Sequence, residues 1–94
     1  MTPNWTPRAL QDVADVTEYI RADNPTAAEQ LIDRVLDIVN QTLVSQPNIG
    51  KPGRVAHTRE FVVHPSYILV YRTKGNSLDI IAFRHTAQKW PRKF

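Results

Sequence analysis

The chain has 94 residues, of which 41% are hydrophobic and 22% charged. This composition predicts one folded domain over residues 1–94 and excludes a disordered or fibrous protein. It contains no cysteine, which excludes disulfides, thiolate metal sites and cysteine nucleophiles. The opening residues, Met1 to Trp5, do not resemble a signal peptide, and the longest apolar stretches (67–71 and 80–83) are too short to span a bilayer. We therefore expect a small soluble protein of the cytoplasm with no membrane partner.

The charge is distributed unevenly between the two halves. Residues 1–46 carry three basic against seven acidic residues, a net charge of −4, and residues 47–94 carry nine basic against two acidic residues, a net charge of +7. A half this basic favours an acidic partner, either a nucleic acid or an acidic protein segment. The alternative is a solvated surface that keeps the protein dissolved.

Two helices are expected at the start of the chain. Thr6 followed by Pro7 is typical of an N-cap and a first helical residue, and Asn24 followed by Pro25 repeats the pattern. The second helix should end before Pro47, because a residue that precedes proline avoids the helical conformation. The predicted apolar stripes are Leu10, Val13, Ala14, Thr17 and Ile20 in the first helix, and Ala28, Leu31, Ile32, Val35, Leu36, Val39 and Leu43 in the second. The two helices should form an antiparallel hairpin.

The second half of the sequence predicts strands. Prolines and glycines make residues 47–56 a loop. Three strands follow, at 58–64, 67–73 and 78–84, separated by turns at 65–66 and 74–77. Residues 4–6 are a candidate for a short edge strand, and the basic, aromatic residues 85–94 for an extended or helical tail. The predicted fold is α+β: an N-terminal helical hairpin packed on a three- to four-stranded, mainly antiparallel sheet.

Strand alternation limits which side chains share a surface. The strands that contain residues 67–71 and 80–83 are apolar on both faces, so both sides of the sheet should be covered. The helices should cover one of these sides. In the last strand, Leu78, Ile80, Ala82 and Arg84 should oppose Asp79, Ile81, Phe83 and His85. Arg59, Arg72 and Arg84 are then candidates to border one surface. The alternative for each arginine is a structural ion pair with Glu60 or Asp79, or exposure to water.

The sequence offers few enzyme motifs. Three scattered glycines cannot form a phosphate-binding loop, and the three histidines lack a metal-ligand spacing, with only Glu60 near them. No metal or other cofactor is expected. Metal-free RNA cleavage needs a base, an acid and cations for the charged intermediate. The side chains that offer such groups are His57, Arg59, His64, Arg84 and His85.

Most aromatic residues have a structural interpretation. Phe61, Tyr67, Tyr71 and Phe83 are typical of core or cross-strand packing, and Trp5 of an anchor beneath the first helix. Trp90 is different, because a tryptophan in a tail is either docked on the domain or available to a partner.

Segments along nearly the whole chain resemble the RelE/ParE superfamily of bacterial toxins. In chain order these are Trp5–Leu10 with Asp12 and Tyr19-Ile20, Asn24-Pro25 with its alanine pair, Pro47–Arg54, Thr58–Val63, Tyr67–Arg72 and Arg84–Pro91. The resemblance implies the fold predicted above. It also implies the toxin of a type II toxin–antitoxin pair, held inactive by a cognate antitoxin whose disordered C-terminal segment wraps the toxin and covers the open sheet face. Such a pair can also contact operator DNA through the antitoxin, in a hetero-oligomer.

The superfamily contains two mechanisms. RelE-like members cut messenger RNA on the ribosome, whereas ParE-like members poison DNA gyrase. The ribonucleases usually carry an arginine just before the Leu-Val-Tyr of the middle strand, where this chain has Ile68, and a C-terminal tyrosine or histidine near the position of Thr86 and Ala87. These departures favour the ParE-like branch and a protein-binding inhibitor over an enzyme.

Two alternatives stay open. One is a metal-independent, ribosome-dependent endoribonuclease, with Arg59, Arg84 and His85 as its candidate catalytic residues. The other is a degenerate relative that binds its antitoxin without being toxic. For the favoured mechanism, the candidate target- or antitoxin-binding residues are Arg59, Arg72, Arg84, Gln88, Lys89 and Trp90.

Overall fold

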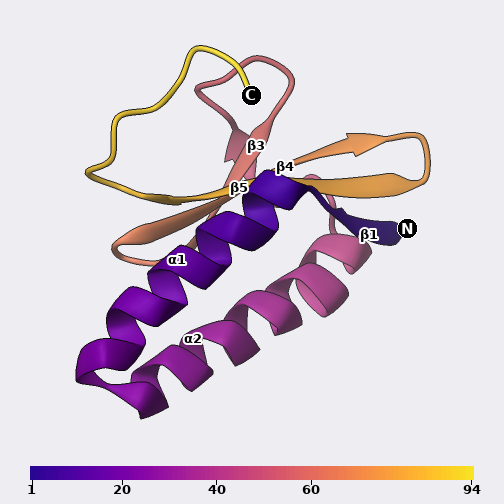
Figure 1. Ribbon diagram of the computed structural model, residues 1–94. Helices are drawn as coiled ribbons and strands as arrows, with labels where there is room; N and C mark the ends of the chain where they lie inside the picture. Colours follow the sequence, from indigo (N-terminus) through magenta and orange to yellow (C-terminus); the bar gives the residue numbers. More distant parts are fainter.

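The computed structural model describes residues 1–94 and has the predicted α+β architecture. Two helices, α1 (Pro7–Asp23) and α2 (Pro25–Asp37), pack as a hairpin on one face of a sheet (Figure 1). The strands are β1 (Thr2–Trp5), β2 (Lys51–Pro52), β3 (Arg59–His64), β4 (Tyr67–Lys74) and β5 (Ser77–His85), in the spatial order β1-β5-β4-β3-β2. None of the helices is long and apolar enough to cross a membrane.

The predicted caps begin both helices. Thr6 Oγ1 accepts a hydrogen bond from the Ala9 N–H, and Asn24 Oδ1 accepts one from the Ala27 N–H. The predicted stripe of α1 is partly wrong, because Leu10 is 56% exposed and Ala14 is exposed as well, while Ala9 is buried. Val13 and Ile20 do pack against the core.

After Asp37 the helix widens into a π-helical segment, η1 (Ile38–Leu43), which the apolar pattern did not predict. The wider turn lets Ile38 and Val39, which are adjacent in sequence, both lie buried together with Leu43. The helical region still ends before Pro47, as predicted.

The sheet has five strands, one more than the upper expected number. The extra strand is β2, whose two residues lie inside the predicted loop and pair with Arg59 and Glu60 of β3. The short N-terminal strand is present, but it spans Thr2–Trp5 and runs parallel to β5. Trp5 packs against the core as expected.

A bulge in β5 overturns the predicted alternation of that strand. Val70 pairs with Ala82 and Tyr71 with Ile80, which leaves Ile81 as an extra residue. Leu78, Ile80 and Phe83 therefore join the core beneath the helices, while Ile81 and Ala82 lie with Val70 on the opposite face, which we call the outer face.

The chain's own C-terminal segment, residues 86–94, covers part of the outer face. Trp90 and Phe94 pack on the cluster formed by Val70, Ile81 and Ala82. The segment has no regular secondary structure and returns across the sheet, so that its end lies beside the loop between β2 and β3 (Figure 1). The outer face of the central strands is thus partly covered by the chain itself.

A buried tyrosine fixes the loop that follows the helices. The Tyr71 hydroxyl accepts a hydrogen bond from the Gly50 N–H at 2.9 Å and donates one to the Pro47 carbonyl at 2.8 Å. We expect Tyr71→Phe to lower the free energy of unfolding by about 1–3 kcal/mol, because it leaves a buried donor and an acceptor without a partner. Urea denaturation at pH 7 measures this loss, and Tyr19→Phe, at a side chain that is 77% exposed, should change nothing. Equal stability of both variants would contradict the expectation.

Candidate functional site

Trp90 docks on the outer face between two arginines. The Arg54 Cζ lies 3.7 Å from the centre of the Trp90 ring, and the Arg84 Cζ lies 6.0 Å from it. Phe94 packs edge-on against the same ring, with 6.4 Å between the ring centres. A cation over an aromatic face is attracted by the ring quadrupole, so these contacts hold residues 86–94 against the sheet.

Glu60 holds Arg54 in place for this contact. The Glu60 side chain is almost fully buried, and its carboxylate accepts hydrogen bonds from the Arg54 backbone N–H at 2.7 Å and from its Nε and Nη2, each at 3.2 Å. Burial alone raises the pKa of Glu60, but the hydrogen bonds and charge of Arg54 outweigh burial and hold the pKa below its usual value. β3 is thereby linked through Arg54 to Trp90.

Arg84 is a buried cation without a counter-charge. It is only 8% exposed, and no carboxylate lies within 4.0 Å of its guanidinium. Its hydrogen bond runs from Nη2 to the Lys89 carbonyl, and its Nε has no partner. With Arg8, Lys89, Trp90 and Pro91 it lines a pocket of about 290 Å³, which we call the Arg84 pocket.

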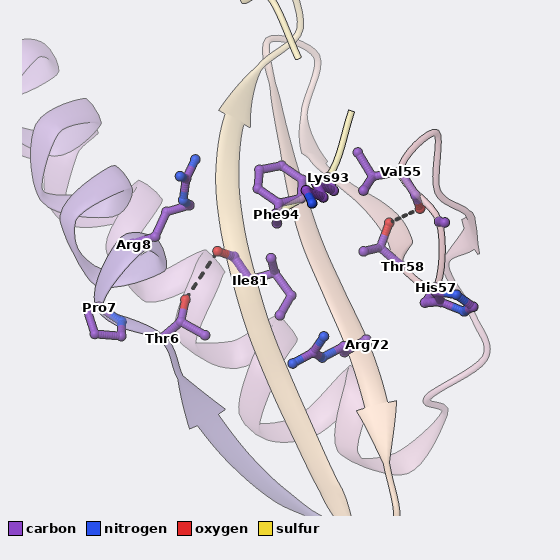
Figure 2. Close-up of a pocket in the computed structure, with 11 residues that line it drawn as sticks. Thr6, Pro7, Arg8, Val55, His57, Thr58, Arg72, Ile81, Lys93 and Phe94 are labelled. Carbon is purple, nitrogen blue, oxygen red and sulfur yellow. Dashed lines mark hydrogen bonds between the residues drawn. The ribbon is translucent and has the colours of Figure 1, made fainter. Parts of the chain in front are cut away.

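A larger hollow of about 550 Å³ lies beside the Arg84 pocket, and Arg8 lines both. Figure 2 shows its walls: Thr6, the N-cap of α1, and Arg8 in its first turn, Phe94 and Lys93 from the C-terminal segment, and Arg72 from β4. The Arg8 Cζ lies 5.4 Å from the centre of the Phe94 ring. The outer face therefore presents a row of cations that extends from one hollow to the next.

Arg72 contributes less free charge than its neighbours. Its Nε lies 3.4 Å from Asp79 Oδ2, so it has the ion pair that the structural alternative predicted. Hydrogen bonds from Ser77 and Asn4, together with Arg72, keep the pKa of Asp79 below its usual value although burial opposes them.

The candidate arginines do not border one surface as a set of three. Arg59 donates hydrogen bonds to the carbonyls of Gly50 and Asn48, at 2.7 and 3.4 Å, and shares a polar hollow with Arg72 near the loop after β2. Arg84 lies elsewhere, because it pairs with Ile68 while Arg59 pairs with Tyr71, three residues further along β4. Strand pairing register, which the sequence did not give, separates them.

The remaining candidates lie near Arg84. Gln88 Oε1 accepts a hydrogen bond from the His85 N–H, Lys89 lines the Arg84 pocket, and Trp90 is docked. His85 Nδ1 accepts a hydrogen bond from the Ala87 N–H, and His64 Nδ1 accepts one from the Ser66 N–H. Both rings therefore stabilise local turns of the backbone. His57 lies in the loop before β3 with φ +66° and lines the hollow of Figure 2.

Sequence reasoning missed Arg8, Arg54 and Phe94 as members of this site. Arg8 lies over Phe94 and Arg54 over Trp90, so both join the site only because residues 86–94 fold back over the outer face. The one usable signal was the excess of cations over acidic residues in the second half of the chain, which does not say which of them remain unpaired.

Comparisons with known proteins agree with this architecture. The family described as the ParE toxin of the type II toxin-antitoxin system parDE matches residues 4–90. The chain is 36% identical over 88 residues to the putative toxin Y4kP of Sinorhizobium fredii, covering 93% of this chain and 90% of that protein. It is 33% identical over 84 residues to toxin RelE2 of Caulobacter vibrioides, covering 89% and 93%.

Solved structures share the fold. A chain of the chromosomal ParDE system from P. aeruginosa superposes with a TM-score of 0.73 at 21% identity, covering 90% of this chain and 95% of that one. The YoeB/ParE toxin from Agrobacterium tumefaciens gives 0.64 at 18% identity, covering 90% and 98%. Because the family match spans nearly the whole chain and two relatives exceed 30% identity, the chain belongs to the ParE toxin family of type II toxin–antitoxin systems, within the RelE/ParE superfamily.

Proposed function

We propose that this toxin stops growth by binding and poisoning DNA gyrase, and that a cognate antitoxin neutralises it. The observation that carries the proposal is the separation of the groups that RNA cleavage would need. Arg59 is tied to the loop before β2 by two carbonyls, Arg84 lies in another pocket, and the Nδ1 of His85 is engaged by a neighbouring N–H. A binding surface of cations around a docked tryptophan suits a protein target better than in-line cleavage chemistry.

The first test is a labelling time course after tightly controlled induction, with thymidine and methionine incorporation followed in one culture. DNA synthesis should fall first and translation later. Purified toxin should also inhibit supercoiling by purified gyrase and trap cleaved DNA. Early collapse of translation with intact DNA synthesis would instead favour the ribonuclease alternative, and no effect on either would favour a protein that only binds its antitoxin.

A single substitution separates binding from RNA cleavage. We expect His85→Ala to retain growth inhibition within about twofold, because binding does not need an imidazole at this exposed position. A ribonuclease that used His85 as its acid or base would lose about 10²–10⁴-fold in rate. Growth after induction and cleavage of ribosome-bound messenger RNA are the two measurements, and loss of both in the variant would contradict the gyrase proposal.

The antitoxin proposal has its own test. A neighbouring reading frame should encode a protein with a DNA-binding N-terminal part and an acidic C-terminal part. Co-expression should restore growth and yield a hetero-oligomer that binds operator DNA through the antitoxin. Such a frame with no effect on toxicity would contradict the pairing.

A further inference from the structure

The Arg84 pocket combines three cations with an apolar wall. Arg8 comes from the first turn of α1, Arg84 from the end of β5 and Lys89 from the C-terminal segment, while Trp90 and Pro91 form the apolar side. No acidic residue lines the pocket. The first turn of α1 contains no acidic residue, and Asp12, one turn after Arg8, accepts a hydrogen bond from the Phe83 N–H and does not line the pocket.

No carboxylate of the chain lies within 4.0 Å of the Arg84 guanidinium. Burying a guanidinium removes it from water at a large cost in free energy unless an anion or a full set of hydrogen bonds replaces that water. Arg84 has one carbonyl partner and a distant aromatic ring, and its Nε is unpartnered. Arg54 and Arg72, by contrast, each have a carboxylate within 3.5 Å.

The shape of the pocket distinguishes among anions. Its volume of about 290 Å³ accommodates one side chain. The wall of Trp90 and Pro91 suits the methylene groups of a side chain, which inorganic phosphate lacks. A stacked base has no open platform here, because Arg54 already lies 3.7 Å over the Trp90 ring and single-stranded nucleic acids need free aromatic faces.

We infer that the Arg84 pocket binds the carboxylate of a glutamate or aspartate side chain carried by an extended acidic segment of a protein partner. The carboxylate lies between Arg84, Arg8 and Lys89, and its methylene groups lie against Trp90. The inference rests on the proposed function for the identity of that partner, the antitoxin, and extends it by naming the chemical group and its pocket.

Nuclear magnetic resonance of the ¹⁵N-labelled toxin alone tests the pocket. The Nε–H of Arg84 and the Nε1–H of Trp90, both buried and without partners, are the reporters. The probes are the capped tripeptide Leu-Glu-Leu, its Leu-Gln-Leu counterpart, inorganic phosphate and a short DNA duplex. We expect saturable shifts of both signals with the glutamate peptide, and binding about tenfold weaker with the glutamine peptide, since charge-assisted hydrogen bonds are lost.

Substitutions at exposed cations keep the test independent of folding. Arg8→Gln with Lys89→Gln should weaken binding of the glutamate peptide about tenfold. The matched control, Lys74→Gln with Arg92→Gln, removes the same charge outside the pocket and should leave binding unchanged. Equal binding of both peptides, a response to phosphate or duplex but not to the glutamate peptide, or no saturable shift would each overturn the inference. Gyrase inhibition is measured separately, so failure of the proposed function would be visible apart from this result.

Discussion

Trp90→Ala is expected to abolish growth inhibition while lowering the free energy of unfolding by only about 1–2 kcal/mol. The ring anchors residues 86–94 through Arg54, Phe94 and the Val70–Ile81–Ala82 cluster. Without it, the cations of this segment are no longer held in one arrangement. A surface that must fit a target then loses its preorganisation, although the core beneath the helices, to which Trp90 does not belong, stays intact.

Growth after induction and urea denaturation of the purified variant measure the two effects separately. Tyr19→Ala is the matched control, because it removes an aromatic ring that is 77% exposed on α1 and does not belong to the outer-face cluster. It should leave both toxicity and stability close to those of the wild type. A toxic Trp90→Ala variant would show that the C-terminal segment is not needed for the target. Loss of the folded state would show that Trp90 acts through stability instead.

Local signals in the sequence were sufficient for the helices and the three long strands. The Thr6-Pro7 and Asn24-Pro25 pairs mark helix starts through caps that involve only neighbouring residues, and these caps are present in the structure. Alternation likewise located β3 and β4, and placed Phe61 and Val63 on one face of β3.

Features that depend on distant contacts were not predictable from the pattern. The bulge at Ile81 exchanges the faces of the residues after it, so Ala82 and Phe83 lie opposite to the expectation. Strand β2 has only two residues and exists because Glu60 and Arg59 offer it a partner. The site depends even more on such contacts, since Arg8, Arg54 and Arg84 are brought to Trp90 by a segment without regular structure.

Glu60→Gln is expected to destabilise the fold by about 2–3 kcal/mol at pH 7. The carboxylate accepts three hydrogen bonds from Arg54 and lies 4.0 Å from the Lys51 Nζ, and a neutral amide cannot replace that charge in a buried position. This expected loss of stability is smaller than for a fully buried ion pair, because the Arg54 side chain remains 45% exposed. Glu29→Gln, which removes an exposed carboxylate paired with Arg21, should cost less than about 0.5 kcal/mol.

The ion pair between Glu60 and Arg54 predicts that the stability of the fold depends on pH. The pKa of Glu60 is lowered in the folded state, so its contribution is complete above the unfolded value near 4.5 and is lost as the pH falls through the lower folded value. The difference in urea midpoint between the wild type and Glu60→Gln should therefore shrink as the pH falls from 7 toward 3. The lowered pKa of Asp79 adds a slope that both proteins share, so only their difference reports Glu60. A difference that grew as the pH fell would contradict a stabilising role for the Glu60 charge.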